Sequence, residues 1–473
     1  MKPLSPRSAC SSFDACGFSR RHALKVGGLG LLGLNLPGLL RAEEQARRIG
    51  TIKPRIKSVI FLFQYGGPSH VDMFDMKPGA PEAIRGPYKP IASSADGIQV
   101  SEKLERTARI MDRVTLIRSV HHTMNNHNSA GYYALTGHAP AVDDQRLRDS
   151  LELFPGYGSV VDKFLPRDPE VPTYVSYPHV IRDGSITPGQ HASFLGKDHD
   201  PFFFTQDPNA AGFALPELTL PSGVEPARLA QRRELQRIID RQSRMLEVSA
   251  AARGLDQYYD RALNMLGSER LRKAFDLSKE PEPLREAYGR TTYGQSCLLA
   301  RRLVEHGARF VTVYFSDNIG GQSTTSGGWD THGFNNTRMF PIVEKFHFPI
   351  TEQTLPTLLT DLETRGMLHE TLVLWMGEFG RTPRINENVS RDHWPHCYTV
   401  MLAGAGVKKG FVYGASDKEG MYPAENPVRP DDLAATLYHL FGIDPKSEVV
   451  ATGSRPLPIS AGEPVTSIFT GAS

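Results

Sequence analysis

Short apolar runs of strand type alternate with helix-type segments along most of the chain. Several of these runs are continuously apolar, as expected for strands that are buried on both faces of a sheet. Strands are predicted at 58–63, 113–119, 171–177, 309–315, 371–376 and 398–402. Helices are predicted at 226–248, 293–306, 340–365 and 430–441, and prolines 341, 349 and 356 predict breaks in the third of them. The order of elements predicts an α/β fold with a mostly parallel central sheet flanked by helices.

The chain contains no linker strong enough to divide it. Its 473 residues are enough for a large core, and residues 43–473 are predicted to form one domain with a helical insertion near 215–290. The formal net charge is only +2. A general nucleic-acid-binding protein normally has a strong basic excess, so the charge argues against a nucleic-acid partner.

Residues 1–42 have the features of an export signal. Arg20 and Arg21 precede an apolar, glycine-rich run at 26–40, which Pro37 interrupts and which is too short to span about 30 Å of hydrocarbon comfortably. The paired arginines resemble a twin-arginine signal. They predict a periplasmic or otherwise exported protein, the twin-arginine translocation machinery as a partner, and no stable membrane span after cleavage near Ala42. A buried amphipathic helix is the alternative interpretation.

Candidate site residues follow the predicted strands, where open parallel sheets bind their ligands. Asp330 and His332 are two positions apart after the strand at 309–315, so an extended backbone would place both on one side. A carboxylate and an imidazole at this spacing can chelate a divalent ion, although a surface turn explains them equally well. Glu378 follows the strand at 371–376. Arg381 could neutralise Glu378 or bind an anionic substrate, and a structural Glu–Arg pair is the alternative.

A denser group of potential metal ligands precedes the strand at 398–402. Asp392, His393, His396 and Cys397 lie within six residues of one another. Imidazole and carboxylate together suit Zn, Mn or Fe, whereas Cys397 begins the strand and fits better as a packed thiol.

The polar segment 121–129, after the strand at 113–119, is a further candidate. It contains three histidines and the hydroxyl of Ser129. These side chains could supply a nucleophile or metal ligands, although a single histidine is more often a hydrogen-bonded structural residue.

The ordered set of motifs resembles domain-of-unknown-function family 1501, which consists of relatives of the alkaline phosphatase and sulfatase superfamily. The motifs are GGPSH at 66–70, LTG at 135–137, GGWDTH at 327–332, GEFGRTP at 377–383, RDHWP at 391–395 and DDLAATLYHLFGID at 431–444. The resemblance covers roughly residues 55–445. It implies an alkaline phosphatase-like three-layer sandwich with a bimetal site at the strand ends.

The resemblance also implies roles for individual residues. Asp330, His332 and His393 would hold one divalent metal ion, which could be Zn, Mn, Ca or Mg, and Glu378 stands at the place of a second-metal ligand or general base. Further candidate metal ligands are Asp392 and His396. The nucleophile's place falls on His127, with Ser129 close by, and Arg381 would clamp the anion.

Three features depart from the superfamily pattern. Gln64, Tyr65 and Gly66 stand where an aspartate ligand is expected, with Asp72 or Asp75 as substitutes from the following loop. Phe379, in place of a histidine, follows Glu378, and the sulfatase Cys-x-Pro-x-Arg motif is absent.

Two functions are compatible with these residues. The first is an exported metal-dependent hydrolase that acts on sulfate or phosphate esters of a small molecule or glycan. The alternative is a non-catalytic exported binding or envelope protein that keeps the fold with a degenerate metal site.

Overall fold

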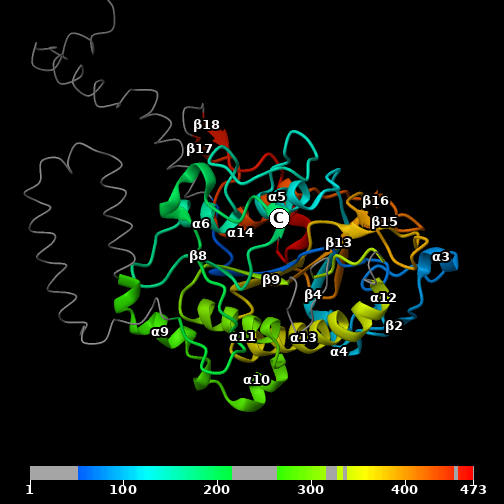
Figure 1. Ribbon diagram of the computed structural model, residues 1–473, viewed down its shortest axis with the longest axis horizontal. Coiled ribbons are helices and arrows are strands. Elements are labelled where there is room, and N and C mark those ends of the chain that lie inside the picture. The colour runs from blue at the N-terminus through cyan, green and yellow to red at the C-terminus, as the bar shows by residue number, and fades with distance from the viewer. Residues whose placement is uncertain (1–51, 216–263, 316–327, 334–337, 452–455, 472–473) are drawn as a thin grey trace, which may run out of the picture. The chain divides into compact units, whose positions relative to one another are not determined.

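An eight-stranded sheet lies at the centre of the described part of the chain (Figure 1). Across the sheet its strands are β14 (Phe411–Tyr413), β4 (Val114–Val120), β13 (Tyr398–Gly404), β10 (Thr371–Met376), β1 (Ser58–Gln64), β9 (Phe310–Phe315), β5 (Tyr174–Tyr177) and β8 (Phe202–Phe203). Neighbouring strands are parallel except at β10–β13 and β13–β4, so β13 runs against the others in this sheet. The topology confirms the predicted α/β class with a mostly parallel central sheet.

The computed structural model describes residues 52–215, 264–315, 328–333, 338–451 and 456–471. Residues Lys53–Ser473 form one compact unit. The predicted export signal at 1–42 and the predicted helix at 226–248 lie outside the described residues. The domain boundaries and the insertion near 215–290 stay predictions.

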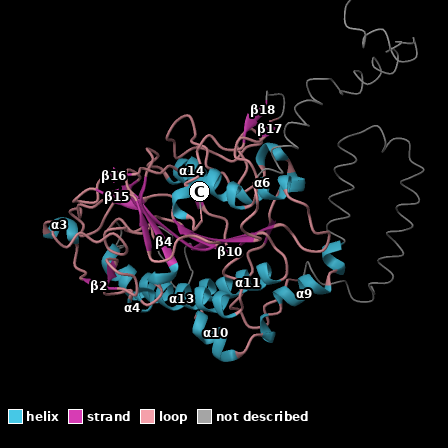
Figure 2. Ribbon diagram, turned by 180° about the vertical axis from the view of Figure 1, so that it is seen from behind, coloured by secondary structure: helices cyan, strands magenta, loops and turns pink. Residues whose placement is uncertain are grey.

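Helices cover both faces of the sheet and give the fold three layers (Figures 1 and 2). One layer contains α5 (His127–Thr136), α6 (Tyr157–Phe164) and α14 (Pro430–Leu440). The opposite layer contains α4 (Glu105–Ala108), α9 (Glu269–Phe275), α10 (Glu282–Tyr288), α11 (Thr292–Glu305) and α13 (Phe348–Thr364).

The central strand β1 shows why both layers are needed. Its side chains alternate between the two faces, as in any strand. Val59, Phe61 and Phe63 pack into a core shared with α6 and α14, whereas Ile60 and Leu62 pack into a second core shared with α11 and α13. All five side chains are buried, so the continuously apolar sequence of β1 reflects burial on both faces.

Short strands and helices lie in the segments that connect the larger elements. The paired short strands are β2 (Pro90–Ala92) with β3 (Gln99–Ser101), β6 (Arg182–Asp183) with β7 (Ser185–Ile186), β11 (Gly380–Arg381) with β12 (His393–Trp394), β15 (Ala415–Ser416) with β16 (Pro423–Glu425), and β17 (Glu448–Val450) with β18 (Pro456–Pro458). The short helices are α3 (Glu82–Arg85), η1 (Met111–Arg113), η2 (Ser193–Leu195), η3 (Lys197–His199), η5 (Leu277–Lys279) and η8 (Thr466–Ile468).

The region predicted as a helix with proline breaks is helical throughout. It consists of α12 (Met339–Ile342), a π-helical turn η7 (Val343–His347) and α13, which contains Pro356 in its interior. Pro349 stands in the first turn of α13, directly after the π-helical turn. A proline ring clashes with the carbonyl four residues earlier in a regular helix, and the wider π turn leaves more room there.

His347, in this π-helical turn, is fully buried and has no hydrogen-bond partner for either ring nitrogen. Its ring packs against Trp329 and Phe315, with centroid distances of 4.6 and 5.3 Å. Burial, with a smaller contribution from the charge of Arg381, lowers the pKa of His347 to about 3. The neutral imidazole is therefore the native form, and the unfolded chain takes up a proton below about pH 6.5.

Replacing His347 with phenylalanine is expected to raise the free energy of unfolding by about 1 kcal/mol at neutral pH, because it removes two unsatisfied buried nitrogens. The native histidine also loses stability as pH falls from about 6.5 towards 3, and this loss disappears in the variant. Urea unfolding at about pH 7.5 and pH 4.5 measures both effects, with exposed His369→Phe as the control. A variant less stable than the parent at both pH values would contradict this prediction.

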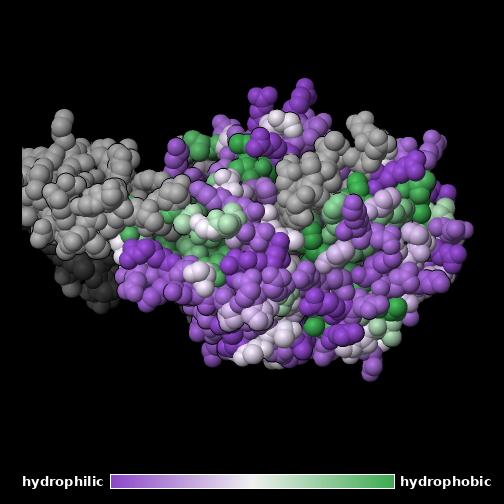
Figure 3. Space-filling model, turned by 60° about the horizontal axis from the view of Figure 1, so that its bottom comes forward, coloured by the Kyte–Doolittle hydropathy of each residue, from purple (hydrophilic) through white to green (hydrophobic). Residues whose placement is uncertain are grey.

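The exterior is mainly hydrophilic on the face that Figure 3 shows, with apolar side chains in small areas. Large exposed apolar residues, such as Val142, Val389 and Val450, come from separate loops. None of the described helices is both long enough and apolar enough to cross a membrane.

Candidate metal centre

Five segments of the chain meet at one edge of the sheet. Strands β1, β4, β9 and β10 share one direction, so their carboxyl ends lie at the same edge, and the antiparallel β13 begins there. Gly66, Asp330 and Glu378 follow β1, β9 and β10 in the chain. His127 follows β4 at the start of α5, and His393 precedes β13. The topology thus gathers the residues that sequence analysis singled out one segment at a time.

Four side chains at this edge form a group that could hold a metal ion, here called the His/Asp cluster: His127, Asp330, His332 and His393. One ligand atom from each lies within 4.8 Å of the others. Asp330 Oδ1 is 2.7 Å from His332 Nε2 and 3.0 Å from His393 Nε2, and the two nitrogens are 2.9 Å apart. His127 Nε2 lies 3.3 Å from Asp330 Oδ2.

Each imidazole of the cluster is held through its other ring nitrogen. The acceptors are Glu378 Oε1 for His127 Nδ1 at 2.8 Å, Asp392 Oδ1 for His332 Nδ1 at 3.1 Å, and the Asn125 carbonyl for His393 Nδ1 at 2.9 Å. Carboxylate and carbonyl oxygens only accept hydrogen bonds, so each Nδ1 carries the proton. In the neutral imidazole the lone pair is then on Nε2, and the three Nε2 atoms converge on Asp330.

Glu378 and Gly66 support His127 from behind. Glu378 is fully buried, and its Oε1 also accepts the Gly66 N–H at 2.8 Å. Gly66 has a φ of +97°, and a Cβ there would lie 2.1 Å from the Asp330 backbone nitrogen. No larger residue fits this close approach, so position 66 contributes its backbone N–H to Glu378 and no side chain to the cluster.

Arg381 lies on β11, opposite His393 on β12, and is only 1% exposed. Its Nη2 donates to Asp330 Oδ1 at 2.8 Å. Its three nitrogens also donate to the carbonyls of Gly66, Gly67, Trp329 and Arg391, and Nη1 lies 3.5 Å from His332 Nε2. The guanidinium therefore holds Asp330 and three neighbouring segments in place, and this contact set gives no support to the predicted anion clamp.

The electrostatic balance of the cluster centres on Asp330. Burial by itself would lower the pKa of His127, but the charge of Asp330 and hydrogen bonds to Asp330 and Glu378 raise it to about 10. Burial and the neighbouring His127 lower the pKa of His393 to about 3. Burial would raise the pKa of Asp330, yet the charge of His127 and the close contacts of its carboxylate oxygens with the three imidazoles hold it well below its usual range. A proton on the metal-free cluster thus belongs on His127.

Aromatic rings pack against the imidazoles. The Phe379 ring is 4.1 Å from that of His393 and 5.1 Å from that of His127, and the Tyr65 ring is 5.0 Å from that of His127. Phe379 and Tyr65 are buried, so they shield the histidines from water on their sides of the cluster. Phe379 stands at the position where the resemblance implies a histidine. Here its ring packs against His127 and His393 as part of the apolar surround of the cluster.

The remaining predicted site residues lie around the cluster or away from it. Asp392 contacts His332 from behind and is 46% exposed at its side chain. His396 packs its ring against Trp394 and lies outside the cluster. The Ser129 hydroxyl accepts the Asp144 N–H at 2.8 Å and donates to the Asp144 carbonyl at 3.1 Å, so it is engaged with the following loop.

The loop after β1 does not bring another acid to the cluster. Asp72 forms a buried ion pair with Arg391, and Asp75 pairs with Lys77 at 2.9 Å and accepts the Ser416 hydroxyl. Sequence analysis missed two backbone groups that support the cluster, the Gly66 N–H and the Asn125 carbonyl. Every residue has a backbone, so the residue type does not indicate which N–H or carbonyl will lie at a site. The sequence did single out segment 121–129, and the resemblance placed the nucleophile at His127, whereas the structure puts His127 in the His/Asp cluster.

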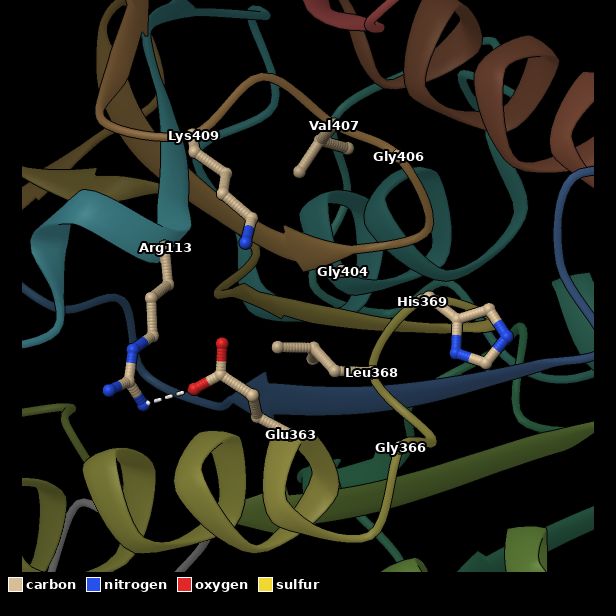
Figure 4. Close-up of a pocket in the computed structure, with 9 residues that line it drawn as sticks. All are labelled: Arg113, Glu363, Gly366, Leu368, His369, Gly404, Gly406, Val407 and Lys409. Atoms are coloured by element: carbon tan, nitrogen blue, oxygen red, sulfur yellow. Dashed lines mark ion pairs between the residues drawn. The ribbon is translucent and has the colours of Figure 1, made fainter.

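A pocket of about 250 Å³ lies at the opposite ends of the strands (Figure 4). Its lining includes Arg113 before β4, His369 before β10, and Lys409 after β13. Glu363 also lines it and pairs with Arg113 at 2.9 Å. Because these groups stand at the other edge of the sheet, the pocket is no part of the His/Asp cluster.

Comparisons with known proteins identify one matching family. The model described as "Protein of unknown function (DUF1501)" matches residues 56–469. No curated protein has a sequence that matches the chain.

Among solved structures, the chain is similar to the lipoteichoic acid synthase LtaP from Listeria monocytogenes at 10% identity, over 85% of this chain and 78% of that chain, with a TM-score of 0.35. It is similar to a sulfatase from Pseudoalteromonas sp. at 12% identity, over 86% and 70% of the two chains, with a TM-score of 0.35. It is also similar to a phosphonate monoester hydrolase from Silicibacter pomeroyi at 11% identity, over 88% and 77%, with a TM-score of 0.39.

Proposed function

The chain belongs to the DUF1501 family, and we propose that this member is an exported, metal-dependent hydrolase of phosphate or sulfate esters. The observation that carries the proposal is the His/Asp cluster, in which three imidazole Nε2 atoms converge on one carboxylate. Its position supports the proposal, because ligands of open α/β sheets bind beyond the carboxyl ends of the strands. The ester class follows from the motif resemblance to phosphatases and sulfatases.

The donor atoms fit a bound cation. Asp330 Oδ1 and the Nε2 atoms of His332 and His393 form a triangle with edges of 2.7, 2.9 and 3.0 Å. One ion with bonds of about 2.0–2.1 Å can contact all three atoms, since two of its ligands can be up to about 4 Å apart. Three acceptor atoms this close repel one another, and a cation among them removes that repulsion.

Residues behind the cluster have the roles that support a metal ligand. An imidazole that binds a metal usually donates its other N–H to a carboxylate or carbonyl, which fixes the ring and increases its basicity. Glu378, Asp392 and the Asn125 carbonyl are in those positions. Arg381 orients Asp330, while Phe379 and Tyr65 exclude water from part of the site. A bound divalent ion would polarise an ester oxygen and stabilise charge on the transferring group.

Hydrolysis is tested with chromogenic esters. Purified full-length protein is assayed on 4-nitrophenyl phosphate, 4-nitrophenyl sulfate and bis(4-nitrophenyl) phosphate with added Zn²⁺, Mn²⁺, Mg²⁺ or Ca²⁺. We expect turnover of at least one ester, lost on chelation and in His332→Ala, and retained in His396→Ala. The absence of turnover for every ester, in protein shown to hold metal, would overturn the proposal.

A non-catalytic binding or envelope protein is the second candidate function. It is favoured by the contacts of Ser129, whose hydroxyl is engaged with the loop after α5, and of Arg381, whose nitrogens all donate within the protein. The same ester assay separates the two candidates, because this one predicts metal binding without turnover.

Export is proposed from the twin-arginine motif, which lies outside the described residues. Replacing Arg20 and Arg21 together with lysine keeps the charge and removes the arginine pair. We expect the protein to accumulate in the cytoplasm, as measured by cell fractionation and immunoblotting. Arg41→Lys is the control and leaves export unchanged. An Arg20→Lys/Arg21→Lys variant that reaches the parent's location would contradict the proposed route.

A further inference from the structure

We infer that the His/Asp cluster takes a single late transition-metal ion such as Zn²⁺, and that the buried Arg381 guanidinium opposes the binding of a second ion beside it. The inference deepens the proposed function and rests on the same site. It differs from the expectation of a bimetal site that the motif resemblance implies.

The composition of the cluster selects the class of ion. Three imidazole nitrogens and one carboxylate oxygen lie within 4.8 Å of one another. Ca²⁺ takes six to eight oxygen ligands, and Mg²⁺ is held by oxygen ligands and keeps several waters. Imidazole suits Zn, Fe, Ni and Cu, so the donor set favours late transition ions over both hard cations.

Among the described residues, the acids closest to the cluster are already engaged. Glu378 Oε1 accepts the His127 Nδ1–H and the Gly66 N–H, which leaves only Oε2 without a partner. Asp392 contacts the far nitrogen of His332 and an amide of Asn386. In the described part of the chain, one unpartnered oxygen beside an N–H donor is too small a ligand set for a second ion.

The acids of the loop after β1 are bound to basic groups. Arg391 contacts both oxygens of Asp72, with Nε–Oδ2 and Nη2–Oδ1 distances of 2.7 and 2.9 Å. Asp75 pairs with Lys77 at 2.9 Å and lies 3.5 Å from Arg118 Nε. These carboxylates stabilise the loop and are not available as ligands in this arrangement.

Arg381 places a permanent positive charge in contact with the cluster. Its Nη2 lies 2.8 Å from Asp330 Oδ1, and its Nη1 lies 3.5 Å from His332 Nε2. A guanidinium stays protonated at any working pH. Two positive charges about 4 Å apart repel each other by about 4 kcal/mol at an effective dielectric constant near 20, and a dication would be repelled more strongly. The first ion meets this repulsion too, but Asp330, its carboxylate ligand, offsets it. A second ion beside Asp330 would add two more positive charges next to a carboxylate that the guanidinium already contacts, so it is disfavoured.

The number and class of ions can be measured without an activity assay. Full-length protein is stripped with a chelator and titrated separately with Zn²⁺, Co²⁺, Ca²⁺ and Mg²⁺ by calorimetry, and native mass spectrometry counts the bound ions. We expect one Zn²⁺ per chain, bound on the order of 100-fold more tightly than Ca²⁺ or Mg²⁺. Two ions of similar affinity, or Ca²⁺ or Mg²⁺ bound as tightly as Zn²⁺, would overturn the inference.

A matched pair of variants tests whether the cluster sets the preference. His393→Asp replaces one cluster nitrogen with oxygen and is expected to reduce the preference for Zn²⁺ over Mg²⁺ at least 10-fold. His396→Asp makes the same change three residues away, outside the cluster, and should leave the preference unchanged. Equal effects of the two substitutions would assign the bound ion to another place and refute the inference.

Failure of this inference is distinguishable from failure of the proposed function. One tightly bound Zn²⁺ with no ester turnover supports the single-ion site and refutes the hydrolase. Two bound ions with metal-dependent turnover refute the single-ion site and leave the hydrolase standing.

Discussion

Replacing Asp330 with asparagine is expected to reduce ester hydrolysis on the order of 10³-fold, the largest functional effect predicted for this chain. Asp330 is the carboxylate on which all three imidazoles converge. Asparagine keeps the shape but removes the charge, so it weakens the hold on a cation and leaves the Arg381 guanidinium uncompensated. Steady-state kinetics and metal titration measure the two effects.

Asp392→Asn is the graded comparison for this change. Asp392 supports His332 from behind, so the variant should lose about 10–100-fold in metal affinity while keeping measurable turnover. His396→Ala should match the parent in both assays. If Asp330→Asn bound metal and turned over ester as the parent does, the cluster would not be the site of the reaction.

Breaking the ion pair between Asp72 and Arg391 is expected to have the largest effect on stability. Both side chains are fully buried, and Arg391 also donates to the carbonyls of Thr382, Pro383 and Ile84. Asp72→Ala leaves a buried guanidinium without its counter-charge, which costs about 3–5 kcal/mol. Denaturant unfolding followed by both fluorescence and circular dichroism measures the loss.

A double variant isolates the pair from the packing around it. Asp72→Leu combined with Arg391→Met removes both charges, so it should be destabilised by less than Asp72→Ala alone. The exposed pair of Lys446 and Glu463 is the control, and Glu463→Ala should change stability by less than about 1 kcal/mol. If Asp72→Ala were as mild as this control, the buried pair would have no such importance. Arg391 directly precedes Asp392 and His393 in the chain, so its ion pair with Asp72 also helps to hold these two residues at the cluster.

The sequence predicted the sheet well because burial on both faces leaves a direct signal. The strand at 371–376 has the predicted bounds, and the strand predicted at 58–63 extends by one residue to Gln64. The strand predicted at 171–177 begins only at Tyr174, since Pro172 has no N–H to donate to a neighbouring strand. The prolines at 341, 349 and 356 predicted breaks in the helix, and this prediction was wrong. The π-helical turn and α13 continue the helix through this region, with Pro349 in the first turn of α13 and Pro356 in its interior.

The candidate site was only partly predictable. Asp330, His332 and His393 were expected to hold one metal ion, and the structure brings these three together with His127. Glu378 and Asp392 were also expected as ligands. In the structure they lie behind the histidines, because each contacts the Nδ1 of a histidine whose Nε2 faces Asp330. Residue type does not distinguish these two positions, since a carboxylate can bind an ion or an imidazole N–H equally well.

The sequence by itself determined the α/β class, the segments that supply the candidate site and the chemical types of the candidate ligands. These features follow from local patterns of burial and from residue identity. The tertiary structure alone decided which nitrogens converge, that Arg381 joins Asp330 in place of Glu378, and that the Gly66 N–H lies against Glu378. Such distances depend on how strands separated by more than 250 residues align side by side, and no local pattern encodes that alignment.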